Sequence, residues 1–181
     1  MKTFERITRS IMVMALVFSA TVMVAKAGAD KTTVVDGIGT YQSKAGWSVK
    51  YDADLIEVNE FDDGVGFVYT GECAGTCMVV ITNTPDKKAE YVRDDIAASW
   101  GSDKVEKYEA PLYADGAEVN AYWAYLGASE GDDGLYETAI AVEHNNGVIL
   151  CECIDHMSGN EMMDMQVCDT LSMIIDSIAF N

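Results

Sequence analysis

The sequence is poor in the side chains that most often carry catalysis, since it has only two histidines and no catalytic signature motif. It contains no Gly-x-Ser-x-Gly elbow, no His-Glu-x-x-His pair and no phosphate-binding loop. His144 and His156 each stand beside an acid at the expected end of a strand, where an exposed turn residue is a commoner role than a catalytic base. The residues offer no nucleophile–base set, so we expect a protein that is not an enzyme and that carries no cofactor.

Basic side chains are also scarce. The chain has 12 lysines and arginines against 30 aspartates and glutamates, which gives a formal net charge of −18 at pH 7. Such a surface repels nucleic acid and anionic lipid, because both carry negative charge of their own. We therefore do not expect nucleic-acid binding. The acidity suits an unknown protein or small ligand that could be basic, although keeping a secreted protein soluble is the commoner role of such a charge.

The first residues form a targeting segment. Lys2, Arg6 and Arg9 make a basic start, an apolar run without charge follows over residues 11–25, and Ala25-Lys26-Ala27 supplies a small-x-small cleavage site. The run is short for a membrane span, which needs about 20 apolar residues. We expect a signal peptide and a secreted or periplasmic bacterial protein, with an uncleaved N-terminal anchor as the alternative.

We expect the signal peptide to cover residues 1–27, with cleavage after Ala27. Removal leaves 154 residues with 8 basic and 29 acidic side chains, a formal net charge of −21 and no stable membrane insertion. Residues 28–39 are small and polar and are predicted to be a flexible lead-in. Residues 40–181 show no internal repeat or composition break, so they are predicted to form a single domain.

The pattern of the domain is strands, one helix, several strands in hairpins and a final helix, which is α+β in class: an antiparallel β-sheet with flanking helices. Its most continuous apolar run is the expected strand at residues 147–154, entered through a tight turn at Asn146-Gly147. The other predicted strands cover residues 40–43, 47–51, 55–58, 65–70, 78–82, 104–109, 117–126 and 135–142.

Both helices carry start signals. Thr84-Pro85-Asp86 offers a capping hydroxyl, a proline at the first helical position and an acid in the first turn, and Gly101 stops that helix after Trp100. Ser158 and Glu161 match a capping box at the start of the final helix. That helix is predicted to bury one apolar stripe, made of Met163, Val167, Leu171, Ile174 and Ile178.

The order of these segments resembles the PsbP-like fold. The resemblance rests on Tyr-Gln-Ser-Lys-Ala-Gly-Trp-Ser-Val-Lys-Tyr at residues 41–51, the proline-started helix ending in Trp100-Gly101, paired strands near residues 121–126, and the closing Ile-Ile-Asp-Ser-Ile-Ala-Phe at 174–180. The group includes the extrinsic photosystem II protein, a nuclear-import Ran-binding factor and many bacterial exported proteins. The resemblance implies an α/β/α sandwich used as a binding or assembly module, and it carries no catalytic motif.

Five cysteines in an exported chain suggest disulfides with one thiol left over. Folding the last helix back over its strand places Cys168 at about the same distance from the connecting loop as Cys153, since a helix rises about 1.5 Å per residue and a strand about 3.3 Å. Cys73 and Cys77 flank an expected hairpin loop and could close it. We therefore predict Cys153–Cys168 and Cys73–Cys77, with Cys151 as a buried free thiol; the other pairings stay open.

The alternative is an extracytoplasmic enzyme or metal protein built on a Cys/His cluster. Cys151, Cys153, His156 and Cys168 are side chains of the kind that zinc takes. A Cys-x-Cys on a strand is not a zinc-knuckle spacing, and export favours oxidation of thiols, so this reading ranks second.

Two surfaces are candidates for partner binding. The acidic loop between two long strands carries Glu130, Asp132 and Asp133, which suit a basic partner, although solvated turns are the commoner role of such acids. Tyr122, Trp123, Tyr125 and Tyr136 fall on both faces of two neighbouring strands. We expect most of them in the core, although one or two could form the floor of a binding surface. We predict an exported, non-enzymatic binding or assembly module.

Overall fold

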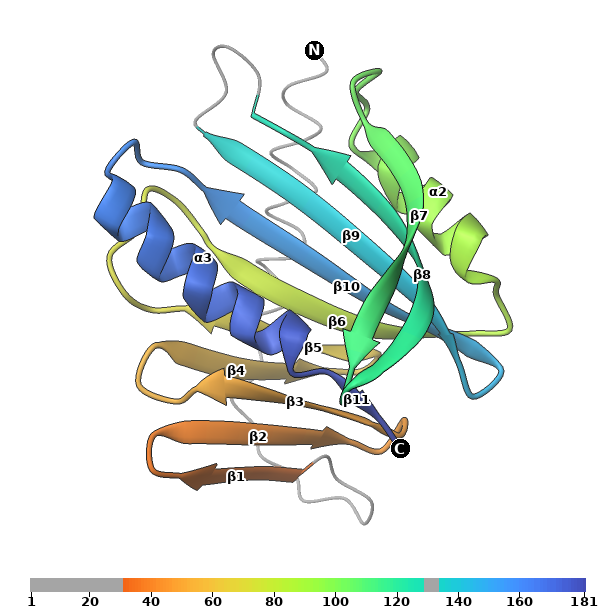
Figure 1. Cartoon of the computed structure of the whole chain (residues 1–181), viewed down its shortest axis with the longest axis horizontal. Coiled ribbons are helices and arrows are strands. Elements are labelled where there is room, and N and C mark those ends of the chain that lie inside the picture. The colour runs from red at the N-terminus through yellow and green to blue at the C-terminus, as the bar shows by residue number, and fades with distance from the viewer. Residues whose placement is uncertain (1–30, 129–133) are drawn as a thin grey trace.

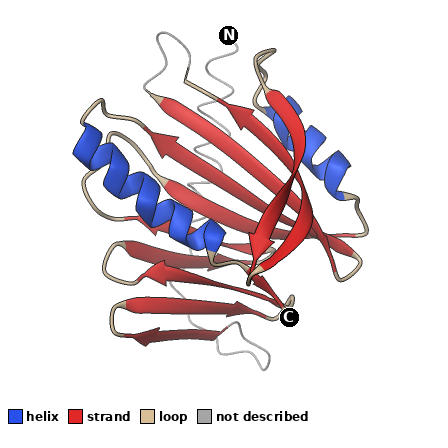
Figure 2. Ribbon diagram, in the orientation of Figure 1, coloured by secondary structure: helices blue, strands red, loops and turns tan. Residues whose placement is uncertain are grey.

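The computed structural model describes residues 31–128 and 134–181, which form two antiparallel sheets and two helices (Figures 1 and 2). The predicted signal peptide at residues 1–27 lies outside the described residues, and so does the acidic loop with Glu130, Asp132 and Asp133. The predicted α+β class is confirmed by this arrangement.

The smaller sheet has the order β1-β2-β3-β11 and the larger sheet the order β4-β5-β6-β10-β9-β8-β7. The strands of the smaller sheet are β1 (Lys31–Val35), β2 (Ile38–Ser43), β3 (Trp47–Asp52) and β11 (Ala179–Phe180). Those of the larger sheet are β4 (Ile56–Phe61), β5 (Gly64–Tyr69), β6 (Met78–Pro85), β7 (Glu106–Ala114), β8 (Ala117–Leu126), β9 (Leu135–His144) and β10 (Gly147–His156). The helices are α2 (Ala89–Ser99) and α3 (Glu161–Asp176).

β10 is the central strand of the larger sheet, paired with β6 on one side and β9 on the other. Its first residues are buried on both faces, which explains why they read as a continuous apolar run. Ile149 and Cys151 point into one hydrophobic core, while Val148 and Leu150 point into another. This alternation of side chains along one strand divides the interior of the domain in two.

The first core lies between the larger sheet, the smaller sheet and α3, and the second lies between the larger sheet and α2. The first core includes Tyr41, Trp47, Val49, Phe67, Ile81, Ile140, Ile149, Leu171 and Ile174. The second includes Ala89, Val92, Ala97, Trp100, Ala124, Leu126, Ala139, Ala141, Val148 and Leu150. Small alanines on β8 and β9 let α2 approach that side of the sheet closely.

The lead-in predicted over residues 28–39 is wrong from Lys31 onward, because β1 and the start of β2 form a hairpin there. Asp36 and Gly37 connect the two strands with positive φ angles of 51° and 80°, as a primed hairpin turn requires. All five residues of β1 are exposed, so the segment buries little and gives no alternating pattern in the sequence.

The predicted start of the first helix is also wrong. Thr84 and Pro85 end β6, pairing with Val148 and Gly147 of β10, and the helix begins only at Ala89. Pro85 is tolerated because it is the last residue of the strand, where the missing N–H costs one terminal ladder bond. The predicted end is confirmed, since Trp100 caps the helix and Gly101 follows with φ +64°.

The predicted tight turn before β10 and the predicted cap of α3 both differ from the structure in their residues. The tight turn before β10 has Asn145 and Asn146 as its central pair, with φ angles of 47° and 63°, so Gly147 already belongs to the strand. Gly147 is needed there because a Cβ would lie 2.8 Å from the Thr84 carbonyl oxygen. At α3 the Ser158 backbone and hydroxyl pair with Asp164 (2.7 and 2.6 Å) instead of with Glu161.

α3 crosses one face of the larger sheet and divides its own residues between core and solvent (Figure 1). Val167, Leu171 and Ile174 are buried, as the predicted stripe requires, whereas Met162 is 78% exposed. Ser177, just past the helix, bonds both the N–H and the carbonyl of Lys50 on β3. Buried side chains on its inner face and hydrogen bonds at its C-terminal end therefore hold the helix in place. The residues of its outer face are not needed for packing.

The two faces of α3 should respond differently to truncation. Ile174→Ala should lower the free energy of unfolding by about 2–5 kcal/mol, because it removes buried methyl groups and leaves a cavity. Met162→Ala should stay within roughly 0.5 kcal/mol of the parent, as surface changes usually do. Urea unfolding followed by circular dichroism measures both, and equal effects of the two variants would contradict this placement of α3.

Candidate functional site

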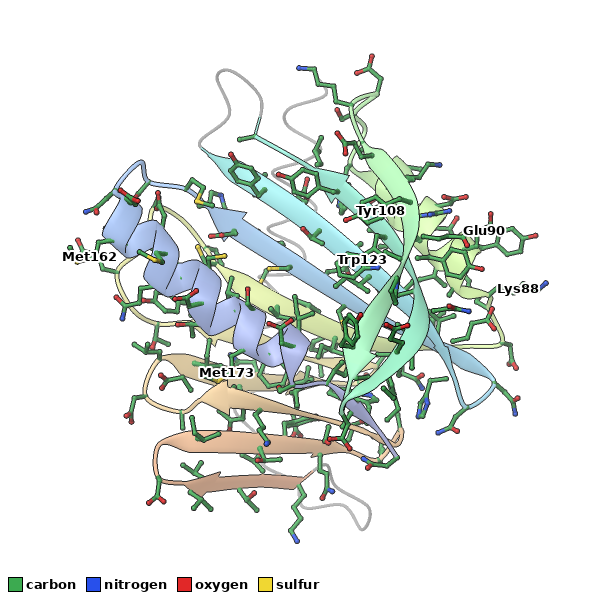
Figure 3. The ribbon with its side chains drawn as sticks, viewed as in Figure 1. Lys88, Glu90, Tyr108, Trp123, Met162 and Met173 are labelled. Atoms are coloured by element: carbon green, nitrogen blue, oxygen red, sulfur yellow. The ribbon has the colours of Figure 1, made fainter. Side chains whose placement is uncertain are left out.

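Four aromatic side chains lie together on strands β7, β8 and β9, on the side of the larger sheet that carries α3. They are Tyr108, Trp123, Tyr125 and Tyr136, and we call them the aromatic row. Figure 3 shows Tyr108 and Trp123 next to each other at this place, where β7 and β8 bend toward the side of α3. α3 packs mainly on β3, β10, β5 and β6, and so leaves the row accessible.

The rings of the aromatic row are arranged in two contacting pairs. Tyr108 and Trp123 are register partners, and their rings stack with centroids 5.9 Å apart and planes 8° from parallel. Tyr125 and Tyr136 contact each other at 6.3 Å in a tilted arrangement. Tyr108 is 44% exposed and the other three are half-buried, so the row presents ring surface to solvent. Trp123 also packs against the first core.

Backbone and side-chain contacts hold the row in place. The Trp123 Nε1–H donates to the Ala110 carbonyl of β7 at 3.0 Å, which satisfies the one polar group of the indole. Antiparallel register then fixes the spacing between neighbouring rings, because Tyr108 faces Trp123 directly across the two strands.

An acid stands within the row. Glu106 on β7 is the register partner of Tyr125 on β8, so the two side chains share this face of the sheet. Burial, reinforced by the nearby Tyr136 and Glu106, raises the pKa of Tyr125 above its usual value and keeps the hydroxyl neutral. Ring faces and a carboxylate in one place form a site that attracts cations, because ring faces carry partial negative charge.

The sequence predicts that one or two of four aromatic residues form a binding floor, with the others in the core. Three of those four, Trp123, Tyr125 and Tyr136, share the row, whereas Tyr122 points to the opposite face and lies 5.6 Å from the Arg93 guanidinium. Tyr108 was missed because it sits in a charged edge strand, and only its pairing with Trp123 reveals its place. The alternation Glu106-Lys107-Tyr108-Glu109 was the available signal, since it puts Glu106 and Tyr108 on one face.

A second accessible surface runs along the outer face of α3. Met157, Met162 and Met165 are all exposed there, and two shallow depressions meet at Met165 and Asp169. The first, about 450 Å³, is lined by Asp52, Leu55, Met162, Met165, Gln166, Asp169, Thr170 and Met173. The second, about 480 Å³, is lined by Met157, Gly159, Glu161, Asp164, Met165, Cys168 and Asp169. Figure 3 shows Met162 and Met173 near the two ends of the helix.

All five cysteines fall within the described residues, and all are free thiols there, so neither predicted disulfide is present. Cys168 is exposed on α3, whereas Cys153 is half-buried on β10 beneath the helix. Cys73 and Cys77 both direct their sulfurs at the Gly75 carbonyl oxygen, at 2.8 and 4.0 Å. The predicted partners are nevertheless neighbours, since Cys168 contributes to the raised pKa of Cys153 and Cys73 contributes to that of Cys77.

The thiols differ in their chemical environment. Burial raises the pKa of Cys151 and Cys153 to about 12, with nearby acids and thiols adding to the effect. Burial likewise raises the pKa of Cys77 to about 12, although a hydrogen bond from the His156 backbone opposes the shift. These three thiols are protonated and poorly nucleophilic at neutral pH.

The metal alternative built on Cys151, Cys153, His156 and Cys168 is not assembled. Within residues 31–128 and 134–181 no group of three or more His, Cys, Asp or Glu side chains is placed to hold a metal ion. The His156 ring nitrogen Nδ1 lies 3.0 Å from the Thr76 carbonyl oxygen, and Cys168 points to solvent on the helix. Cys151 and Cys153 both adjoin the first core, whereas His156 is engaged with the Thr76 carbonyl and Cys168 is exposed.

The two histidines take structural places. His156 packs against Gly75, where an added Cβ would lie 2.6 Å from the imidazole ring. His144 contacts the Phe180 ring, with 5.1 Å between ring centroids, and its Nε2 lies 2.8 Å from the Asn145 side-chain nitrogen.

One carboxyl, Glu152, has a strongly shifted pKa. Burial and the neighbouring Glu137 raise the pKa of Glu152 to about 7, so this carboxyl is partly protonated near neutral pH. Glu152 belongs to the opposite face of β10 from Cys151, away from the aromatic row.

Comparison with known proteins bears on the fold alone. No family model matches the chain, and no curated protein matches it by sequence. The solution structure of cyanobacterial PsbP (CyanoP) from Synechocystis sp. PCC 6803 matches with a TM-score of 0.52 and 16% sequence identity, covering 88% of this chain and 99% of that chain. The chain therefore has a PsbP-like fold, and the resemblance inferred from the sequence is confirmed.

Among the helices of the described residues, none is long and apolar enough to cross a bilayer. The aromatic row and the outer face of α3 are two accessible surfaces that combine apolar groups with acids.

The thiols should separate cleanly by reactivity. Iodoacetamide treatment of native, unreduced protein at pH 8, followed by peptide mass mapping, should modify Cys168 first, because it is the exposed cysteine. Cys77, Cys151 and Cys153 should stay unmodified until the protein unfolds, since their raised pKa values leave almost no thiolate. Modification of Cys168 only after reduction would instead support the Cys153–Cys168 disulfide predicted from the sequence.

Proposed function

We propose that this protein is an exported, non-enzymatic binding or assembly module that takes a basic segment of a partner protein on its aromatic row. The observation that carries the proposal is the accessible stack of Tyr108 on Trp123, with Glu106 and Tyr125 beside it. Arginine and lysine side chains bind ring faces through cation–π contact, and arginine also stacks as a plane.

Charge favours such a partner. The chain carries a formal net charge of −18, which becomes −21 if residues 1–27 are removed. A field of this sign draws a basic segment toward the surface and repels acidic competitors. The rings then supply contact area at low entropic cost, because a tyrosine or tryptophan has few rotatable bonds to fix.

The scaffold supports a recognition role. The proposed architecture is an α/β/α sandwich in which α2 and α3 cover opposite faces of the larger sheet, leaving the β7–β8 wing of the sheet uncovered on one side. Rings carried on paired strands hold their spacing better than rings on a loop. β7 is also an edge strand, so an extended partner could add backbone pairing to the side-chain contacts.

The extracytoplasmic enzyme of the alternative reading has less support. The buried thiols have raised pKa values, and the two histidines are engaged with backbone or neighbouring side chains.

Removing a ring from the row should weaken binding of a basic probe. With fluorescently labelled oligoarginine as the probe, Tyr108→Ala should weaken binding about two- to fivefold, the loss expected from one exposed cation–π contact of roughly 0.5–1 kcal/mol. Fluorescence anisotropy measures the dissociation constants. Binding should also weaken as salt rises, and oligolysine should bind less tightly than oligoarginine because it lacks the planar group.

Tyr113→Ala is the matched control. Tyr113 is 61% exposed on the same strand, but it points to the opposite face, where it donates to Glu118 at 2.7 Å. It should leave oligoarginine affinity unchanged. Equal losses in Tyr108→Ala and Tyr113→Ala would reduce the interaction to general charge attraction, and no loss in Tyr108→Ala would remove the row from the proposal.

A further inference from the structure

The outer face of α3 gathers sulfur side chains in an unusual way. Met157, Met162 and Met165 are the exposed methionines of the described residues, at 36%, 78% and 54%, and Cys168 is the exposed cysteine. Methionine and cysteine are ordinarily among the buried residue types. Four accessible sulfurs within twelve residues of one another call for a reason other than core packing.

Three of these sulfur residues line one depression. Met157, Met165 and Cys168 border the second depression of α3, of about 480 Å³, together with Glu161, Asp164 and Asp169. Met165 and Cys168 are three positions apart on the helix, which places their Cβ atoms roughly 5–6 Å apart on one face. No described residue that lines the depression is basic, so its charge is negative throughout.

Met157 is held over the helix by a defined loop. Its backbone N–H donates to the Gly134 carbonyl at 2.9 Å, and the next two residues are tied to α3 through Asp164. The Ser158 N–H and hydroxyl and the Gly159 N–H all donate to the Asp164 carboxylate, at 2.7, 2.6 and 3.0 Å. These hydrogen bonds lower the pKa of Asp164, so the carboxylate stays charged beside the depression.

We propose that Met157, Met165 and Cys168 form a binding site for a soft monovalent cation, Cu⁺ or Ag⁺. Thioether and thiolate ligands select such ions, whereas Mg²⁺ and Ca²⁺ need oxygen ligands and Zn²⁺ prefers imidazole, thiolate and carboxylate. Binding breaks the S–H bond of Cys168, forms a sulfur–metal bond and releases the proton to solvent. The cation replaces the thiol proton, so the net charge of the site does not change. The carboxylates around the site are not ligands, but their negative charge attracts the cation.

This site differs from the Cys/His cluster considered from the sequence. Of the residues in that cluster it uses Cys168 alone, and its other two ligands are thioethers. The site is also separate from the aromatic row, so a soft cation and a basic partner can be tested independently of each other.

The test uses protein purified after expression of the whole chain, kept reduced and free of oxygen. Cu⁺ is titrated in competition with the chromogenic chelator bicinchoninate, and Ag⁺ is titrated by calorimetry. One equivalent should bind, with affinity rising with pH because a proton is released. Cys168→Ser and Met165→Leu should each weaken binding by roughly tenfold or more, since even supporting residues of metal sites cost about 10–100-fold when changed.

Met173→Leu and Met162→Leu are the matched controls, because both methionines border the other depression of α3. They should bind Cu⁺ and Ag⁺ as the parent does, and circular dichroism should show all four variants folded. X-ray absorption at the copper edge should show sulfur ligands only. Unchanged binding in Cys168→Ser and Met165→Leu, or equal losses in the two controls, would overturn the site, and so would Zn²⁺ binding at the same place with higher affinity than Cu⁺.

Discussion

The structure depends on the burial of β10 on both of its faces. Ile149 and Cys151 enter the first core beneath α3, and Val148 and Leu150 enter the second core beneath α2, so one strand anchors both helices. Pairing with β6 and β9 along nearly its whole length satisfies the backbone of this apolar strand. Because β10 is the centre of the larger sheet, β9, β8 and β7 extend from it as a wing. The outermost strand, β7, buries Leu112 and Ala114 in the first core near its end, whereas its first residues, 106–109, are exposed.

Both proposed surfaces follow from that geometry. At the exposed start of β7, Tyr108 stacks on Trp123, and Trp123 in turn packs against the first core. α3 buries Leu171 and Ile174 to cover β10, which leaves its opposite face with methionines that have no core to join. The two proposed binding surfaces, the aromatic row for a basic segment and the outer face of α3 for a soft cation, therefore lie next to the first core and not within it.

Sequence patterns predicted most elements of the fold because burial leaves a periodic signal. The run at β10, the α3 stripe and the β8 strand over residues 117–126 all follow from it. The patterns failed in two places. Thr84-Pro85 resembles a helix start, but it ends the strand β6, which pairs with β10. β1 buries no residue, so it leaves no hydrophobic pattern in the sequence. At the site, three of the four rings are among the aromatic residues that the sequence singles out. The place of Tyr108 could not be predicted, because it follows from the pairing of β7 with β8. The state of the thiols depends on three-dimensional placement that the sequence does not give.

The central claim is that the aromatic row is the surface at which a basic partner binds. Two-dimensional amide NMR of isotopically labelled protein, titrated with oligoarginine, tests it most directly. The account predicts that the amides of residues 106–108 and 122–125 and the Trp123 indole N–H shift together and saturably, while those of α2 stay in place. Shifts spread evenly over the acidic surface, or confined to residues away from β7, β8 and β9, would contradict it.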